Sequence, residues 1–97
     1  MSGYILSPPA EADLLDIWYY TRAKWSANQA DIYIRLLHSG MEKVASDPRL
    51  GHACDHVRLG YHRYHIGSHV LYFRMTGGQV DFMRVLHQSM DAGRHIK

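Results

Sequence analysis

The chain has 97 residues, of which 46% are apolar and 21% charged, a composition typical of a globular domain and not of a disordered tail. Its single cysteine, Cys54, excludes an intramolecular disulfide and with it the class of small disulfide-stapled secreted proteins. No apolar run approaches the roughly 20 residues of a membrane helix, and Met1 to Ala10 lack the pattern of a signal peptide. We therefore expect a cytoplasmic protein without direct membrane contact.

The net charge of +2 is unevenly distributed along the chain. Residues 1–48 hold four basic and six acidic side chains, whereas residues 49–97 hold seven basic and three acidic ones. A basic, histidine-rich second half suits a negatively charged partner, either nucleic acid or an acidic protein segment. The alternative is that the two halves neutralise each other in the fold.

The first half of the chain predicts a short strand over residues 3–6 and then two helices. Ser7 is placed as the N-cap of the first helix, with Pro8 at its first position. Ser26 offers the second helix a cap, and Asp47-Pro48 ends that helix. Residues at helical spacing form one stripe on each helix: Ala10, Leu14, Ile17, Trp18 and Thr21, then Ala30, Ile34, Leu37, Met41 and Val44. Two helices joined by a few residues form an antiparallel hairpin.

The second half predicts a three-stranded antiparallel meander. Residues 48–56 break every period and are expected to form a loop. From Val57 onward the chain is rich in Tyr, Val, Ile and Phe, and Gly67-Ser68 and Gly77-Gly78 are suited to two-residue turns. The predicted fold is a single small α+β domain of order β-α-α-β-β-β, in which the meander packs on the helices and a short C-terminal tail follows.

With two-residue turns, Arg63 pairs with Tyr72 and Arg74 pairs with Asp81. This register gives the sheet two different faces, and a slip of one residue would exchange them. The face expected to pack on the helices carries His62, Tyr64, Ile66, Leu71, Phe73, Met75, Val80, Phe82 and Leu86. The opposite face, here called the outer face, is expected to carry Tyr61, Arg63, His65, Tyr72, Arg74, Asp81, Met83 and His87. Because no part of the chain is left over to cover the outer face, we expect it to be open and to contain the functional site.

Metal binding and nucleophilic catalysis are both poorly supported, although the chain has eight histidines. His62 and His65 point to opposite faces of a strand, and neither a Cys-x-x-Cys nor a His-Glu-x-x-His motif is present. Cys54 lies near His52 and His56, but an isolated cysteine without a local signature is more often inert. We expect no metal ion and no cofactor.

The residues of the outer face suggest two chemistries. Arg63 and Arg74 beside Tyr61 and Tyr72 suit either phosphates and stacked bases or an acidic peptide. With His87 as an acid or base, the same residues could cleave RNA at its own 2′-hydroxyl. The alternative is a solvated sheet face held together by a cross-strand ion pair.

Four stretches of the chain match a known pattern. Tyr4-Ile5-Leu6-Ser7-Pro8 opens it, Arg58-Leu59-Gly60-Tyr61 follows in the centre, and Gly67–Arg74 and Arg84–Asp91 are its most specific parts. Together they resemble the ParE-type toxins of the RelE/ParE superfamily, from bacterial type II toxin–antitoxin systems. The resemblance covers nearly the whole chain, and implies one toxin domain over residues 1–97 with the same order of elements.

This resemblance implies a toxin that inhibits DNA gyrase by trapping it on cleaved DNA, and that is not itself an enzyme. A ParD-like antitoxin would neutralise it by wrapping the helical hairpin and the sheet edge, and DNA would be contacted only through the antitoxin or gyrase. The residues expected to contact target or partner are Tyr61, Arg63, His65, Tyr72, Arg74, Arg84 and His87.

The sister branch, the RelE-type ribosome-dependent mRNA interferases, is the alternative, with Arg63, Arg74 and His87 as its catalytic residues. The last tyrosine of the chain is Tyr72, so the C-terminal catalytic tyrosine of many such nucleases is absent. Val70 stands where some of them have an arginine, and a net charge of +2 is low for binding among ribosomal phosphates. A third hypothesis is a non-toxic binding module, which serves as an antitoxin sink or is a degenerate relic.

Overall fold

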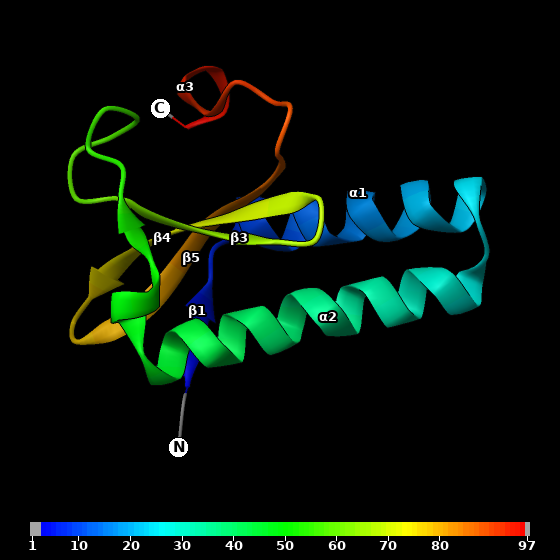
Figure 1. The fold of residues 1–97 in the computed structure, drawn as a ribbon, viewed down its shortest axis with the longest axis horizontal. Helices are drawn as coiled ribbons and strands as arrows, with labels where there is room; N and C mark the ends of the chain where they lie inside the picture. Colours follow the sequence, from blue (N-terminus) through cyan, green and yellow to red (C-terminus); the bar gives the residue numbers. More distant parts are fainter. Residues whose placement is uncertain (1–2, 97) are drawn as a thin grey trace.

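The computed structural model describes residues 3–96 and confirms the predicted α+β fold (Figure 1). Its helices are α1 (Pro8–Lys24), α2 (Ala27–Ser46) and α3 (Ala92–His95), with a short 3-10 helix at Pro48–Leu50. Its strands are β1 (Tyr4–Leu6), β2 (His52–Ala53), β3 (His62–Ile66), β4 (His69–Thr76) and β5 (Gln79–His87). Within residues 3–96, no helix combines the length and the apolar composition that a membrane span requires.

Both long helices begin where the sequence predicts, and each start has a capping hydrogen bond. The Ser7 hydroxyl accepts a hydrogen bond from the backbone N–H of Ala10 at 3.2 Å, and Pro8 opens α1. The Ser26 hydroxyl accepts one from the N–H of Gln29 at 3.1 Å. These caps satisfy backbone donors that the first turn of a helix leaves free. They therefore define the residue at which each helix begins.

The sheet has five strands in the described chain, in the order β1-β5-β4-β3-β2. The predicted meander forms its centre, but β1 pairs with β5 in parallel, so the sheet is mixed rather than purely antiparallel. The predicted loop over residues 48–56 contains the 3-10 helix and β2, which pairs with the start of β3. The prediction that strand structure begins at Val57 is wrong, because β3 begins at His62.

The register of the meander is the predicted one up to a β-bulge in β5. Arg63 pairs with Tyr72 and Arg74 with Asp81, but the register shifts by one residue between Tyr72 and Phe73, so that Tyr72 pairs with Arg84. A bulge leaves some backbone groups without hydrogen-bond partners in the neighbouring strand. Here, side chains from the N-terminal part of the chain bond to these groups. The Ser7 hydroxyl donates to the carbonyl of Met83 at 2.8 Å, and an Asp13 carboxylate oxygen accepts from the N–H of Val85 at 2.9 Å.

The bulge exchanges the faces of the last residues of β5. Val85 packs in the core beneath the helices, whereas Leu86 packs on the outer face. The predictions that Leu86 faces the helices and that His87 lies on the outer face are therefore wrong. Each additional residue in a strand reverses the side-chain alternation beyond it, and β-bulges give no reliable sequence signal here.

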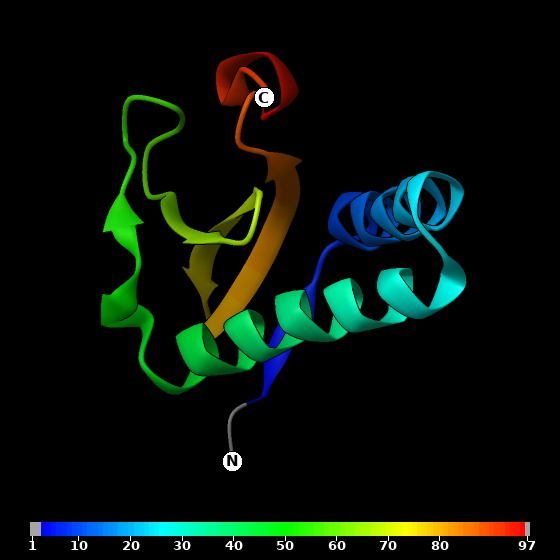
Figure 2. The same cartoon turned by 45° about the vertical axis from the view of Figure 1, so that its right-hand side comes forward.

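The main core lies between the hairpin and one face of the sheet. Figure 2 shows α1 and α2 along one side of the strands. The buried core residues are Leu14, Ile17, Leu37, Met41, Val44, Leu71, Phe73, Val80, Phe82 and Val85. The apolar stripes predicted on both helices thus supply the helical half of this core. Gly40 is also buried, and a Cβ there would lie 2.6 Å from Cδ1 of Ile66, so a larger side chain would require Ile66 to move.

A second, smaller core covers part of the outer face, so the prediction that this face is open is wrong. Ala92 and Ile96 of the C-terminal segment and Cys54 of the 54–61 loop pack over Tyr72 and its neighbours. Figure 1 places α3 and this loop together at the same side of the sheet, away from α2. The full set of buried residues is Cys54, Tyr61, Val70, Tyr72, Leu86, Ala92 and Ile96.

Candidate functional site

The tyrosines predicted to bind on the outer face are buried beneath the second core. Tyr61 is 4% exposed and Tyr72 5% exposed, so neither ring is free to stack on a base. Burial raises the pKa of Tyr72 above its usual value, and the nearby Arg63 opposes that shift. The phenol of Tyr72 is therefore neutral at pH 7 and acts as a support for its neighbours.

The arginines predicted on the outer face remain accessible beside these rings. Arg63 lies next to Tyr72 across the strand pair and is partly exposed, and Arg74 lies two residues further along β4 and is exposed. Nε of Arg74 is 3.7 Å from a carboxylate oxygen of Asp81, which is a loose ion pair. His65 is exposed at the far end of β3. The outer face thus carries accessible basic side chains around the buried rings of Tyr61 and Tyr72.

Arg84 is held inside the fold by contacts from two directions. Its Nε and Nη2 donate to the two carboxylate oxygens of Asp13 at 2.7 and 2.8 Å, and its Nη1 donates to the carbonyl of His95 at 2.9 Å. The hydrogen bonds to Asp13 raise the pKa of the guanidinium further. Arg84 therefore joins α1 and the C-terminal segment to β5.

His87 lies on the hairpin side of the sheet, away from Arg63 and Arg74. Its ring packs edge-on against His69, with ring centroids 5.3 Å apart, and His69 in turn contacts Tyr33 of α2. The backbone N–H of Ser89 donates to Nδ1 of His87 at 3.1 Å, so Nδ1 is an acceptor and Nε2 is the ring's N–H donor. The structure thus separates His87 from the two arginines with which it was grouped.

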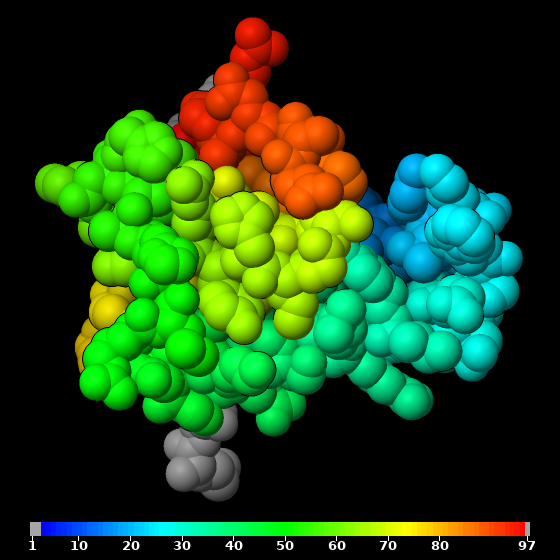
Figure 3. Space-filling model, viewed as in Figure 1, coloured from blue at the N-terminus to red at the C-terminus, as the bar shows by residue number. Residues whose placement is uncertain are grey.

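Next to His87, a cleft of about 540 Å³ opens between the hairpin and the end of the sheet. Figure 3 shows this hollow between the blue-to-cyan hairpin and the yellow-to-orange sheet residues. Its lining residues are Tyr20, Thr21, Lys24, Trp25, Gln29, Tyr33, Ser68, His69 and His87. The volume is typical of a site that accepts a side-chain cluster or a small ligand.

The floor of this cleft is a fixed chain of hydrogen bonds. The N–H of Ser68 donates to the Tyr33 hydroxyl at 2.9 Å, and the same hydroxyl is hydrogen-bonded to Nδ1 of His69, 2.6 Å away. Burial and the nearby His87 lower the pKa of His69 to about 4, so its ring is neutral at pH 7. The floor of the cleft therefore combines a phenol hydroxyl with an uncharged imidazole.

The rim of the cleft is aromatic and cationic. Trp25 is 71% exposed and Tyr20 is 64% exposed, unusual values for rings of this size. Nζ of Lys24 lies 5.7 Å from the centre of the Tyr20 ring. An acidic partner segment with apolar side chains fits such a lining, since the rings contact the apolar groups and the cation and N–H donors contact the carboxylates.

The sequence predictions did not include this cleft. His69 lies in the Gly67–Arg74 stretch but was given no role of its own, and Tyr20, Trp25 and Tyr33 fall outside the predicted apolar stripes. The one sequence feature that pointed to the cleft was the position of these aromatic residues outside the stripes. A large aromatic side chain that does not pack in the main core is free to contact another element or a partner. Which element it contacts depends on how the hairpin docks on the sheet.

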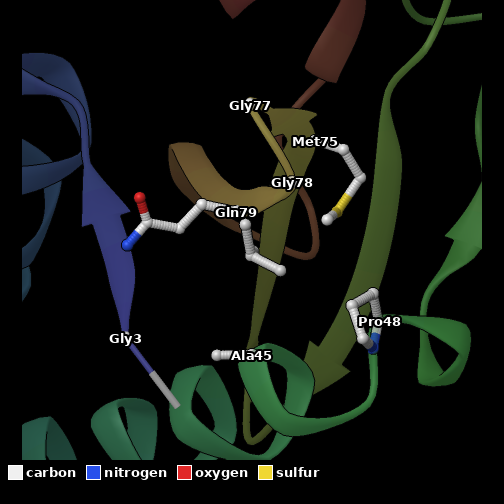
Figure 4. A pocket seen from close by; sticks show the side chains of 8 residues that line it. Gly3, Ala45, Pro48, Met75, Gly77, Gly78 and Gln79 are labelled. Atoms are coloured by element: carbon white, nitrogen blue, oxygen red, sulfur yellow. The ribbon is translucent and has the colours of Figure 1, made fainter. Parts of the chain in front are cut away.

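The remaining hollows offer less chemistry. The pocket in Figure 4, of about 400 Å³, lies between the end of α2 and the β4–β5 turn, and among its described lining residues Gln79 has the one polar side chain. In residues 3–96, no three His, Cys, Asp or Glu side chains come together as a metal-binding group. The accessible arginines of the outer face and the aromatic cleft are thus the two candidate sites.

Comparisons with known proteins agree with this fold. Residues 4–92 match the model of the family described as ParE toxin of type II toxin–antitoxin system, parDE. The chain is 46% identical over 96 residues to Toxin ParE1 of Mycobacterium tuberculosis, covering 98% of each chain. It is 44% identical over 96 residues to Toxin ParE1 of Caulobacter vibrioides, covering 99% of each. A solved structure of the chromosomal ParDE system from P. aeruginosa superposes with a TM-score of 0.79 at 15% identity, covering 90% of this chain and 96% of the other, which is a likeness of fold.

Proposed function

Since this chain belongs to the ParE toxin family of type II toxin–antitoxin systems, we propose that it inhibits DNA gyrase and is neutralised by a cognate antitoxin. The observation that supports this most directly is the similarity to two ParE1 toxins over nearly the full length of each chain. Gyrase is the target that the resemblance to ParE-type toxins implies. The protein acts as an inhibitor that traps the enzyme on cleaved DNA.

The separation of His87 from Arg63 and Arg74 favours the inhibitor over the mRNA interferase. A nuclease of this size needs its acid or base and its cations within hydrogen-bond reach of one phosphate. Here the arginines lie on the outer face, whereas His87 lies beside His69 and Tyr33 on the hairpin side. Tyr72, the last tyrosine of the chain, is buried and does not replace His87.

We assign target contact to the accessible basic side chains of the outer face, Arg63, His65 and Arg74. Tyr61 and Tyr72 support these side chains from below, and Arg84 holds the C-terminal segment in place. His87 belongs to the cleft. All the residues predicted to contact a target or partner thus have a proposed role. The exposed residues bind, and the buried ones hold them in position.

We assign antitoxin binding to the cleft and the adjoining apolar surface of α2, where Ile32 and Leu36 are exposed one turn apart. An amphipathic acidic segment would lay its apolar side chains against Trp25 and α2. Its carboxylates would meet Lys24 and the Nε2–H group of His87. Antitoxin and target then use different parts of the surface.

A supercoiling assay with purified gyrase and plasmid DNA tests the main proposal. The free protein should inhibit supercoiling and leave trapped, cleaved DNA, while a ribosome-programmed translation reaction should retain intact mRNA. Cut mRNA with normal supercoiling would instead establish an interferase, and His87 would then be the first residue to mutate. If neither reaction responds, gyrase and the ribosome are both excluded as targets.

Point variants test the two assigned surfaces. Arg63→Ala and Arg74→Ala should each weaken gyrase inhibition by about tenfold, since loss of one charge-assisted contact removes roughly 1.5 kcal/mol. Trp25→Ala should weaken capture by the cognate antitoxin. Lys43→Ala removes an exposed cation from α2, outside both surfaces, and is the matched control. Unchanged inhibition in both arginine variants would refute the assignment of the outer face.

A further inference from the structure

The loop between β2 and β3, residues 54–61, is held together by backbone hydrogen bonds of its own. The N–H of Cys54 donates to the carbonyl of Tyr61 at 2.9 Å and closes its base. Inside it, Val57 and Arg58 donate to the carbonyl of Cys54 at 2.9 and 3.3 Å, and Tyr61 donates to the carbonyl of Arg58 at 3.1 Å. These bonds fix the path of the backbone on both sides of the tip.

Further contacts hold the loop to the sheet and shape its tip. Cys54, Val57 and Tyr61 pack in the second core. Gly60 has a φ of +85°, a conformation that other residues rarely adopt, and its N–H donates to a carboxylate oxygen of Asp55 at 3.0 Å. Asp55 is therefore occupied within the loop.

At the tip of this ordered loop, Leu59 is 84% exposed, the highest value among the exposed large apolar side chains of the described chain. Arg58 lies beside it, with Cζ 5.7 Å from the centre of the Tyr61 ring. Within residues 3–96, Arg58 forms no ion pair with a carboxylate. Figure 3 shows the green 54–60 region standing out at the upper left, apart from the cleft.

We propose that this loop is an anchor for the protein target: Leu59 enters an apolar recess on the target, and Arg58 meets carboxylates at the border of that recess. An apolar side chain on a preordered loop binds without the entropic cost of ordering the loop. The unpaired guanidinium selects an acidic border. This inference rests on the proposed gyrase inhibition, and it adds a target contact beyond the arginines of the outer face.

The test compares Leu59→Ser with wild type in gyrase supercoiling assays and in direct binding to gyrase without DNA. Leu15→Ser, which removes a leucine that is 57% exposed on α1, is the matched control. Leu59→Ser should raise the concentration for half-inhibition at least about tenfold, as expected when a leucine loses its buried contact. Its binding to gyrase should weaken equally, and its melting temperature should stay that of wild type. Leu15→Ser should behave as wild type in all three measurements.

Two results would overturn the anchor. One is Leu59→Ser inhibiting and binding gyrase as wild type does. The other is Leu59→Ser losing inhibition in the supercoiling assay while it binds gyrase without DNA as wild type does, which would make the loop a nucleic-acid contact. A wild-type protein without effect on gyrase would instead refute the proposed function, and the anchor with it.

Discussion

Asp13 is the carboxylate that holds three parts of the fold together. It accepts hydrogen bonds from Nε and Nη2 of Arg84 and from the backbone N–H of Val85, at 2.7, 2.8 and 2.9 Å. Through Arg84 it is also linked to the carbonyl of His95. One side chain of α1 thus stabilises the bulge in β5 and the attachment of the C-terminal segment.

Asp13→Asn should lower the free energy of unfolding by about 2 kcal/mol, because it leaves the partly buried guanidinium of Arg84 without its counterion. Urea denaturation measures this change. Asp16→Asn, on an exposed position of the same helix, should stay within about 0.5 kcal/mol of wild type. Equal stabilities of the two variants would show that the pair with Arg84 contributes little.

His69 makes stability depend on pH in a predictable direction. Its pKa is lowered from 6.5 to about 4 in the folded protein, by burial first and by the nearby His87 second. Between these values the unfolded chain binds more protons, so stability falls as the pH falls from 6.5 to 4, and it is unaffected by this group above that window. Because the ring is only half-buried, we expect a loss of about 1–2 kcal/mol.

His69→Asn should flatten the pH profile of stability in that window, whatever its effect on stability at pH 7. Denaturation midpoints measured across the window, for wild type and variant, give the comparison. His65→Asn removes an exposed histidine from the same sheet and should keep the wild-type slope. A wild-type slope in His69→Asn would assign the pH dependence to other groups.

Among the elements, the C-terminal segment has the largest effect on the candidate site, because it decides which part of the outer face is exposed. Ala92 and Ile96 pack against Tyr72 and Leu86 in the second core, and the carbonyl of His95 is held by Arg84. A helix of this length, residues 92–95, is not stable alone. Its position is therefore fixed by these tertiary contacts.

Ile96→Ala should destabilise the protein by about 2 kcal/mol through the loss of buried methyl groups. Thermal denaturation measures this, and hydrogen exchange should show faster exchange in the C-terminal segment. Arg94→Ala, whose side chain is 85% exposed, is the matched control within the same segment. If Ile96→Ala is as stable as Arg94→Ala, the segment is not anchored by its apolar residues.

For the molecule as a whole, stability depends mainly on the apolar interface between the helical hairpin and the sheet. Leu37, Met41 and Val44 of α2 are fully buried against Phe73 and Phe82 of the meander. The second core is smaller and does not involve the hairpin. Disrupting the main core should therefore unfold the entire chain.

Leu37→Asp should abolish folding, because an unpaired charge in the core costs several kcal/mol and a domain of this size has only about 5–15 kcal/mol in total. Far-UV circular dichroism would show the loss of helix. Leu36→Asp, the adjacent and exposed position, should remain folded. A folded Leu37→Asp protein would show that the core assignment is wrong.

Local patterns in the sequence predicted much of this molecule, because they depend on near neighbours. The helix caps at Ser7 and Ser26, the apolar stripes and the glycine turns each act over a few residues, and the structure confirms them. The pairing of Arg63 with Tyr72 and of Arg74 with Asp81 follows from the turn lengths and is also confirmed. These features were sufficient to predict the α+β class and the order of elements.

The candidate sites were less predictable, because they depend on residues far apart in the chain. Asp13 and Ser7, about 70 residues before β5, satisfy the bulge that moves His87 away from the arginines. The cleft needs Tyr33 and His69 to meet, and the burial of Tyr72 needs the C-terminal segment to fold back over it.

The fold class, the hairpin core and the basic residues of the outer face could thus be predicted from local sequence patterns. The exposure of those residues, and the side of the sheet on which His87 lies, depend on tertiary contacts. A strand has a side-chain period of two, so one extra residue reverses its faces. In β5 that residue is accommodated because Ser7 and Asp13, far back in the sequence, supply partners for the backbone groups it leaves free.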